Sequence, residues 1–132
     1  MIGLADTSVW IGAVRRRNDA FFSLVDEGVV LVCPVVELEL LVGLPRAAAV
    51  ATWRSRFAEL PSVAIDPRTT ERAAEVVELL AARRGGQHRG TPIADLLIAA
   101  CAEVAGVPLL HDDGHFERIA AVTGQPLRRL RG

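Results

Sequence analysis

The sequence contains no lysine, and all 15 of its basic residues are arginine. Chemistry that needs a lysine amine, such as a Schiff base or a Walker phosphate-binding loop, is therefore excluded. No apolar run approaches the roughly 20 residues of a membrane-spanning helix, and residues 1–5 are too short an apolar stretch for a signal peptide. We therefore expect a cytoplasmic protein that does not interact with a membrane.

Cysteine is scarce, since only Cys33 and Cys101 are present, each in an apolar stretch. A free cysteine in such a place usually behaves as a small buried hydrophobic residue, and a reducing cytosol keeps it unpaired. No cysteine or histidine spacing typical of a zinc site is present. Neither cysteine is therefore expected to bind metal.

An excess of charge of either sign is also missing, because the formal net charge is only −1 at pH 7. Binding to a nucleic acid would therefore depend on local arginine clusters instead of overall charge. The candidate clusters are residues 15–17, residues 83, 84 and 89, and residues 128, 129 and 131.

The length of 132 residues is typical of one domain with one hydrophobic core. Apolar runs predict strands at residues 1–5, 29–33, 63–65, 109–111 and 127–130. Helical periodicity, prolines and capping residues predict helices at residues 9–14, 34–43, 47–60, 69–84, 93–105 and from about 115, with Thr91-Pro92 as the cap before residue 93. We therefore expect a single domain over residues 1–132, with a mostly parallel sheet of about five strands in a three-layer α/β/α sandwich.

Acidic residues follow the predicted strands or occur early in the helices after them. In parallel sheets, ligands bind where the carboxyl ends of strands meet the amino ends of helices. Taken singly, Asp6 and Asp113 could cap helices, and Asp95 could interact with a helix dipole. The acidic residues at these positions are Asp6, Glu37, Glu39, Asp95, Asp112 and Asp113.

Glu39 is the acid for which a purely structural role is hardest to find. Its apolar neighbours on the predicted helix leave few exposed faces, so we expect its carboxylate to be buried and to need a partner. A shared cation would supply that partner and would relieve the repulsion between several carboxylates. Because the ligands are hard oxygen atoms, the sequence predicts Mg²⁺, with Mn²⁺ as the alternative to it, and not zinc.

Four segments resemble the PIN domain, and in particular the VapC toxins of bacterial toxin–antitoxin pairs. They are residues 6–11 (DTSVWI) after the first strand, 39–43 (ELLVG), 92–100 (PIADLLIAA) and 109–119 (LLHDDGHFERI). Each segment alone is weak evidence, but in this order they span nearly the whole chain. The resemblance implies a metal-dependent endoribonuclease that hydrolyses RNA phosphodiester bonds without a covalent intermediate and thereby inhibits translation.

Matched by position, the resemblance implies that the catalytic and metal-binding acids are Asp6, Glu39, Asp95 and Asp113. Glu37 and Asp112 remain the alternatives to Glu39 and Asp113. Where His111 and His115 stand, the family often has Thr or Ser and a further Asp, so the sequence departs from the pattern at two positions. The number of metal ions, one or two, stays open. Thr7 and Ser8 are candidates to cap the first helix, and Ser8 also to hold a carboxylate.

The resemblance also implies partners. They are an RNA substrate (tRNA, rRNA or mRNA), a VapB-type antitoxin, and either a second copy of the chain in a homodimer or a toxin–antitoxin hetero-oligomer. The antitoxin tail is expected to lie along an apolar groove and to present a basic residue to the acids. Trp10, Phe21 and Phe22 fit either such a groove or the core.

Other functions fit parts of the sequence. A phosphoryl-accepting receiver domain also has acids at strand ends, but it uses a lysine, and it has paired acids after the first strand, where only Asp6 stands. The main alternative is a catalytically impaired PIN-like module that binds RNA or protein, because His115 replaces an expected acid. A PIN nuclease that acts outside toxin–antitoxin pairs is less compatible with so short a chain.

Overall fold

The structure is a computed structural model of the chain, and it describes residues 1–112 and 114–132. The predicted site residue Asp113 therefore lies outside the described residues. The strands are β1 (Gly3–Ala5), β2 (Val30–Leu31), β3 (Leu109–His111) and β4 (Leu127–Arg129). The helices are α1 (Thr7–Arg16), α2 (Asp19–Asp26), α3 (Pro34–Val42), α4 (Ala47–Ala58), α5 (Pro67–Ala81), α6 (Ile93–Ala105) and α7 (Glu117–Thr123).

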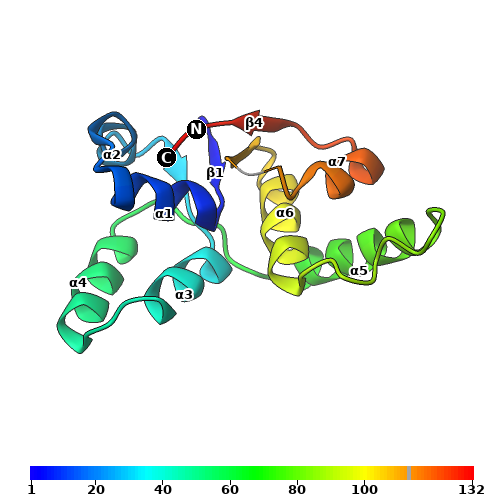
Figure 1. Cartoon of the computed structure of the whole chain (residues 1–132), viewed down its shortest axis with the longest axis horizontal. Helices are drawn as coiled ribbons and strands as arrows, with labels where there is room; N and C mark the ends of the chain where they lie inside the picture. Colours follow the sequence, from blue (N-terminus) through cyan, green and yellow to red (C-terminus); the bar gives the residue numbers. More distant parts are fainter. Residues whose placement is uncertain (113) are drawn as a thin grey trace.

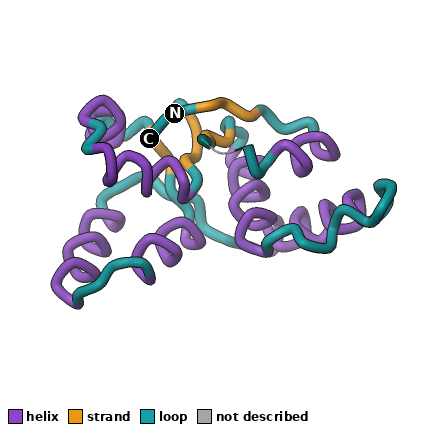
Figure 2. The backbone as a smooth tube through the Cα atoms, in the orientation of Figure 1, coloured by secondary structure: helices purple, strands orange, loops and turns teal. Residues whose placement is uncertain are grey.

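Within the described residues, four strands form one parallel sheet in the order β2-β1-β3-β4. Helices cover both sides of this sheet, with α1 to α4 on one side and α5 to α7 on the other (Figure 1, Figure 2). This arrangement confirms the predicted α/β/α class. No helix of the described chain combines the length and the apolar character needed to cross a membrane.

The predicted sheet of about five strands is wrong in its count. At residues 63–65 the expected strand does not form, and Val32 and Ser62 make only an isolated bridge. Pro61 precedes this segment and the N-cap of α5 follows it at Asp66, so little backbone is left to extend a ladder. The helix α2 was not predicted, although Asn18 caps it by accepting a hydrogen bond from the Phe21 N–H.

The core lies around β1, β3 and a cluster of aromatic rings beneath α1. Trp10 is fully buried and packs edge-on against Phe21 and Phe57, with ring centroids 5.1 and 5.6 Å apart. Such contacts add to the apolar area that the rings bury. They hold α1 against α2 and α4, and so fix the position of Asp6 at the start of α1.

The two cysteines belong to this core, as predicted. Cys33 precedes α3 and Cys101 lies within α6, and both are buried and free. The hydrogen bond between the two thiols and their burial raise the pKa of Cys101. The same hydrogen bond lowers the pKa of Cys33, and the two thiols lie where α3 packs against α6.

Candidate active site

Asp6 occupies the junction between β1 and α1. Its backbone N–H donates to the Leu110 carbonyl at 3.0 Å, which places it beside the end of β3. Its carboxylate caps α1 by accepting a hydrogen bond from the Val9 N–H at 3.2 Å, and the Ser8 hydroxyl donates to it at 2.8 Å. Asp6 is only 4% exposed. The cap is therefore Asp6 and not Thr7 or Ser8, while Ser8 holds the carboxylate as expected.

Glu39 lies on α3 with its side chain exposed, so its predicted burial is wrong. The apolar residues of α3 do not all face the core, because Leu38 and Val42 are 61% and 84% exposed. The Thr7 hydroxyl donates to Glu39 Oε1 at 2.6 Å. This bond brings Glu39 to the start of α1, one residue from Asp6. Glu37 is half-buried instead, and this burial raises its pKa.

Asp95 lies in the first turn of α6, where the positive end of the helix dipole favours a carboxylate. The expected side-chain cap from Thr91 is absent, because the Thr91 hydroxyl donates to the Gln87 carbonyl at 2.9 Å. Asp95 is half-buried and lies on the wall of a pocket of about 450 Å³, which we call the polar pocket. Its lining residues are Gly90, Thr91, Pro92, Asp95, Gly114, His115, Glu117, Arg118 and Ile119.

The segment after β3 contains the remaining candidates. His111 is 6% exposed, and its Nδ1 has no hydrogen-bond partner among the described residues. Asp112 forms an ion pair with Arg16 at 3.0 Å, and Arg129 Nε lies 3.9 Å from its other oxygen. Two arginines therefore already balance the Asp112 carboxylate. His115 is exposed and lines the polar pocket with Asp95.

The described acids meet the requirements of a hard cation in their chemistry. Asp6, Glu39 and Asp95 offer only carboxylate oxygens, which are the ligands that Mg²⁺ and Mn²⁺ prefer. Within residues 1–112 and 114–132, no three acidic, histidine or cysteine side chains come close enough together to hold a metal ion. The oxygen ligands of these acids thus suit a hard cation. The fourth predicted metal-binding acid, Asp113, lies outside the described residues.

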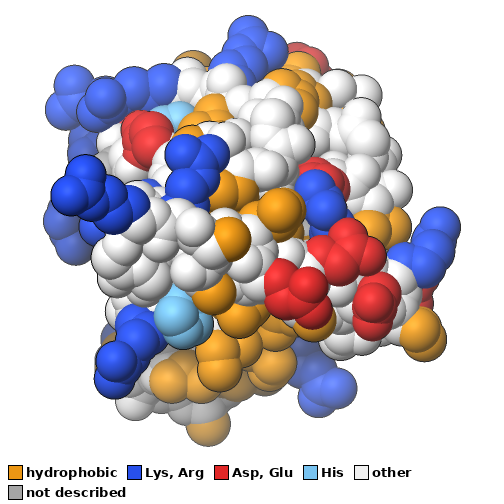
Figure 3. Space-filling view, turned by 90° about the vertical axis from the view of Figure 1, so that its right-hand side faces the viewer, with side chains coloured by type: hydrophobic (Ala, Val, Ile, Leu, Met, Phe, Trp, Pro, Cys, Tyr) orange, Lys and Arg blue, Asp and Glu red, His pale blue; other side chains and the backbone are white. Residues whose placement is uncertain are grey.

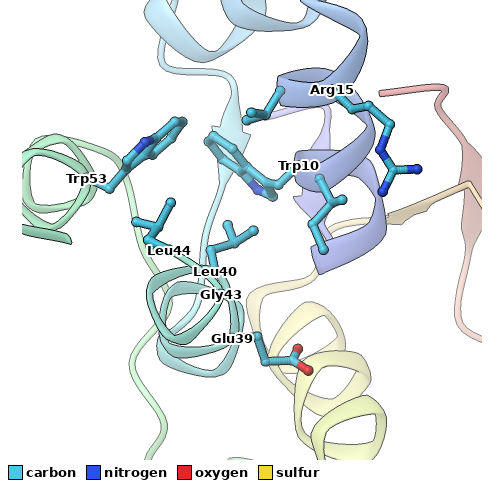
Figure 4. A pocket seen from close by; sticks show the side chains of 9 residues that line it. Trp10, Arg15, Glu39, Leu40, Gly43, Leu44 and Trp53 are labelled. Atoms are coloured by element: carbon cyan, nitrogen blue, oxygen red, sulfur yellow. The ribbon is translucent and has the colours of Figure 1, made fainter. Parts of the chain in front are cut away.

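A second pocket, of about 350 Å³, adjoins Glu39 and is lined mainly by apolar side chains; we call it the apolar groove. Figure 4 shows Trp10 from α1 and Trp53 from α4 next to each other on its wall, with ring centroids 6.4 Å apart, and Glu39 at one end. Ile11 and Val14 are 45% and 50% exposed at its wall. The lining residues are Trp10, Ile11, Val14, Arg15, Glu39, Leu40, Gly43, Leu44 and Trp53.

Of the three aromatic residues expected in a groove, only Trp10 lines it. Phe21 is 2% exposed and belongs to the core. Phe22 is half-buried under the Arg56 guanidinium, 5.0 Å from its ring centroid, and does not line the groove. Sequence reasoning missed Trp53, and the available signal was its position four residues before Phe57, which puts both large apolar side chains on one face of the helix.

Both the sequence and the fold of this chain match known proteins. Residues 4–122 match the PIN domain. The chain is 36% identical over 130 residues to Ribonuclease VapC18 of Mycobacterium tuberculosis, covering 96% of this chain and 93% of that protein. It is 37% identical over 119 residues to Ribonuclease VapC21 of the same species, covering 87% and 80%. The DNA-bound VapBC structure from Salmonella typhimurium has the same fold, with a TM-score of 0.75 over 98% of each chain at 16% identity.

Proposed function

Because this chain belongs to the PIN domain family, we propose that it is a metal-dependent endoribonuclease and the toxin of a VapBC-type toxin–antitoxin pair. The observation that carries the proposal is the bond from Thr7 to Glu39, which brings a second carboxylate to the start of α1 beside Asp6. It occurs on the fold of a family whose relatives here are named ribonucleases. We also propose that residues 1–132 form one domain acting in the cytoplasm, in agreement with its two free thiols.

Asp6, Glu39, Asp95 and Asp113 would hold Mg²⁺ or Mn²⁺ in this proposal. The ion would lower the pKa of a water molecule and balance the charge of the phosphodiester. The rest of the site keeps the acids in place. Ser8 orients the Asp6 carboxylate, Thr7 orients Glu39, and the amino end of α6 stabilises the negative charge of Asp95.

The apolar groove is the part of the surface that fits an antitoxin segment. Its wall offers exposed apolar side chains at Ile11 and Val14, and Glu39 at its end would accept a basic residue of the partner. The exposed apolar residues Leu38 and Val42 on α3 suit a further contact within a homodimer or a toxin–antitoxin hetero-oligomer.

The direct test is cleavage of a panel of tRNA, rRNA and mRNA hairpins by the purified protein, with Mg²⁺ or Mn²⁺ and with EDTA. Asp6→Asn and Asp95→Asn remove the charge from one acid each. Asparagine caps a helix as well as aspartate does, so Asp6→Asn is expected to keep α1 folded. The matched control is Asp26→Asn, whose side chain is 76% exposed on α2 and lines neither pocket.

We expect discrete cleavage that requires metal, is unchanged in Asp26→Asn, and falls in both site variants by more than the roughly 10- to 100-fold that outer-shell partners of a metal site cost. Absence of cleavage from every RNA would overturn the proposal. Cleavage that ignores EDTA and both site substitutions would overturn it as well, because the activity would then come from a contaminant. Either result would favour a PIN-like module that binds RNA or protein without cutting.

A further inference from the structure

The polar pocket is lined by one arginine, Arg118, which forms no ion pair with an acid in the described part of the chain. Arg118 lies in α7, is exposed, and lines the pocket together with Asp95. The ion pairs of the described residues engage other arginines, and none involves Arg118. Arg83, which sequence analysis grouped with the nearby arginines, donates to the Ala121 carbonyl at 3.0 Å. Arg83 therefore ties the loop after α5 to α7, whereas the Arg118 guanidinium remains available.

The acidic side chains of the polar pocket would repel an anion, and the Arg118 guanidinium opposes this repulsion. Asp95 and Glu117 place two carboxylates on its wall. Glu117 lies over the turn before α7, since a Cβ added to Gly114 would be 3.1 Å from both of its carboxylate oxygens. An anion that enters this pocket meets repulsion from both acids unless cations oppose it. Arg118 is the arginine that the chain itself supplies on this wall.

We propose that Arg118 binds a backbone phosphate of the RNA substrate within the polar pocket, next to the nucleotide that Asp95 faces. This inference rests on the proposed function. A guanidinium presents a planar set of N–H donors that matches phosphate oxygens in a bidentate arrangement. The pocket volume of about 450 Å³ lies within the usual range for a site that holds a small organic group. Arg118 is thus a substrate-positioning residue beside the acids.

Arg118 belongs to a different surface from the proposed antitoxin groove. The two pockets share no lining residue, and the groove is formed by α1, α3, α4 and the Gly43–Leu44 turn. In Figure 1, α4 and α7 lie at opposite ends of the molecule. Figure 3 views the α7 end, where arginine and acidic side chains are interspersed instead of forming one basic patch. Substitution of Arg118 should therefore weaken RNA binding and leave antitoxin binding unchanged.

The test is the binding of a fluorescein-labelled RNA hairpin with a single-stranded loop, followed by anisotropy in EDTA over a range of NaCl concentrations. The variants are Arg118→Gln and Arg118→Lys, and the matched control is Arg54→Gln, an exposed arginine on α4 that lines neither pocket. Cleavage by the same proteins is followed in Mg²⁺. Circular dichroism checks that each variant is folded.

We expect Arg118→Gln to raise the dissociation constant about 10- to 100-fold, as the loss of a charged hydrogen bond does. The slope of log affinity against log salt should fall by about 0.7, the value for one phosphate contact to a single strand. Arg118→Lys should keep the slope with an intermediate affinity, and Arg54→Gln should match the wild type. A change in salt slope reports a lost phosphate contact, which a purely structural effect of the substitution would not produce.

Two other results overturn the inference in distinguishable ways. If the wild type binds and cleaves RNA and Arg118→Gln does so with the same affinity and slope, Arg118 does not contact phosphate and the proposed function stands. If the wild type neither binds nor cleaves any RNA of the panel, the proposed function fails and the role of Arg118 fails with it.

Discussion

The two pockets of this molecule differ in chemistry although both reach the predicted acids. The apolar groove includes Glu39 and is walled by tryptophan, isoleucine, valine and leucine side chains. The polar pocket includes Asp95 and is walled by glycine, threonine, histidine and charged side chains. Apolar walls suit a protein segment that buries hydrophobic side chains, whereas polar walls suit a charged substrate. Each pocket thus contains one of the predicted acids, and the two surfaces can be altered separately.

The largest expected effect follows substitution of Trp10, the fully buried tryptophan that lines the apolar groove. Trp10→Ala should lower the free energy of unfolding by about 3–5 kcal/mol, because this side chain is fully buried against Phe21 and Phe57. Trp53→Ala should cost less, since Trp53 is only half-buried at the groove wall. Urea unfolding of both variants measures the difference. Equal losses in the free energy of unfolding would contradict this expectation, because the buried and the half-buried tryptophan would then contribute equally to stability.

The next effect concerns Glu39, the proposed metal-binding acid that also lines the apolar groove. Glu39→Gln should reduce RNA cleavage by more than about 100-fold while leaving the fold intact, because the amide oxygen still accepts the Thr7 hydrogen bond. Glu37→Gln is the matched control on the same helix and should cleave at close to the wild-type rate. Single-turnover rates in Mg²⁺ measure both. A larger loss in Glu37→Gln would assign the metal-binding role to Glu37.

A smaller effect is expected on partner binding alone. Ile11→Asp places a charge on the groove wall at a side chain that is 45% exposed, so it should weaken antitoxin binding about 10-fold without loss of cleavage. Ile93→Asp is the control, because Ile93 is 74% exposed and lines neither pocket. Titration calorimetry with the proposed VapB-type antitoxin gives the affinities. Equal affinity in both variants would remove the groove as the antitoxin site.

The smallest effect concerns α5, which packs against α6 and α7 on the side of the polar pocket. Asp66 caps α5, and the hydrogen bond from Arg68 lowers the pKa of Asp66 below its ordinary value of 3.8. Because the pKa is lower in the folded state, the charged cap stabilises the fold above that value. Its contribution is lost as the pH falls through the lowered pKa.

Asp66→Ala should therefore destabilise the protein at neutral pH and have less effect in strong acid, while Asp66→Asn keeps a neutral cap at every pH. Thermal unfolding followed across the acid range measures this. A loss in Asp66→Ala that does not depend on pH would mean that the charge of the cap contributes nothing. RNA cleavage by either variant should stay at the wild-type level at neutral pH.

Much of the fold could be predicted because its signals are local. The strand at residues 109–111 was predicted with its observed bounds, and Pro34 begins α3 as its fixed φ angle favours. Gly106 ends α6 in the left-handed conformation that glycine adopts without strain. The segment at residues 63–65 has the composition of a strand, but a strand also needs a neighbour along its whole length, which composition does not reveal.

The acids of the candidate site were named from the sequence and stay a prediction, whereas their surroundings could not be predicted. The acid types and their order follow from the sequence, whereas the exposure of Glu39 depends on which side of α3 its neighbours cover. The pairing of Arg16 with Asp112 joins residues 96 positions apart, and no local pattern announces it. Similarly, Arg83 and Arg118 are chemically alike in the sequence, yet within the described residues a backbone carbonyl holds Arg83 and not Arg118.

The sequence by itself determined the α/β class and the placing of acidic residues after the strands, because periodicity, capping and charge act over a few residues. The tertiary structure decided which tryptophans enclose the groove, which aspartate the arginines balance, and which arginine remains available beside Asp95. These outcomes depend on how the helices pack on the sheet. Packing brings together side chains from distant parts of the chain, and their distances are set by the whole fold and not by their neighbours in sequence.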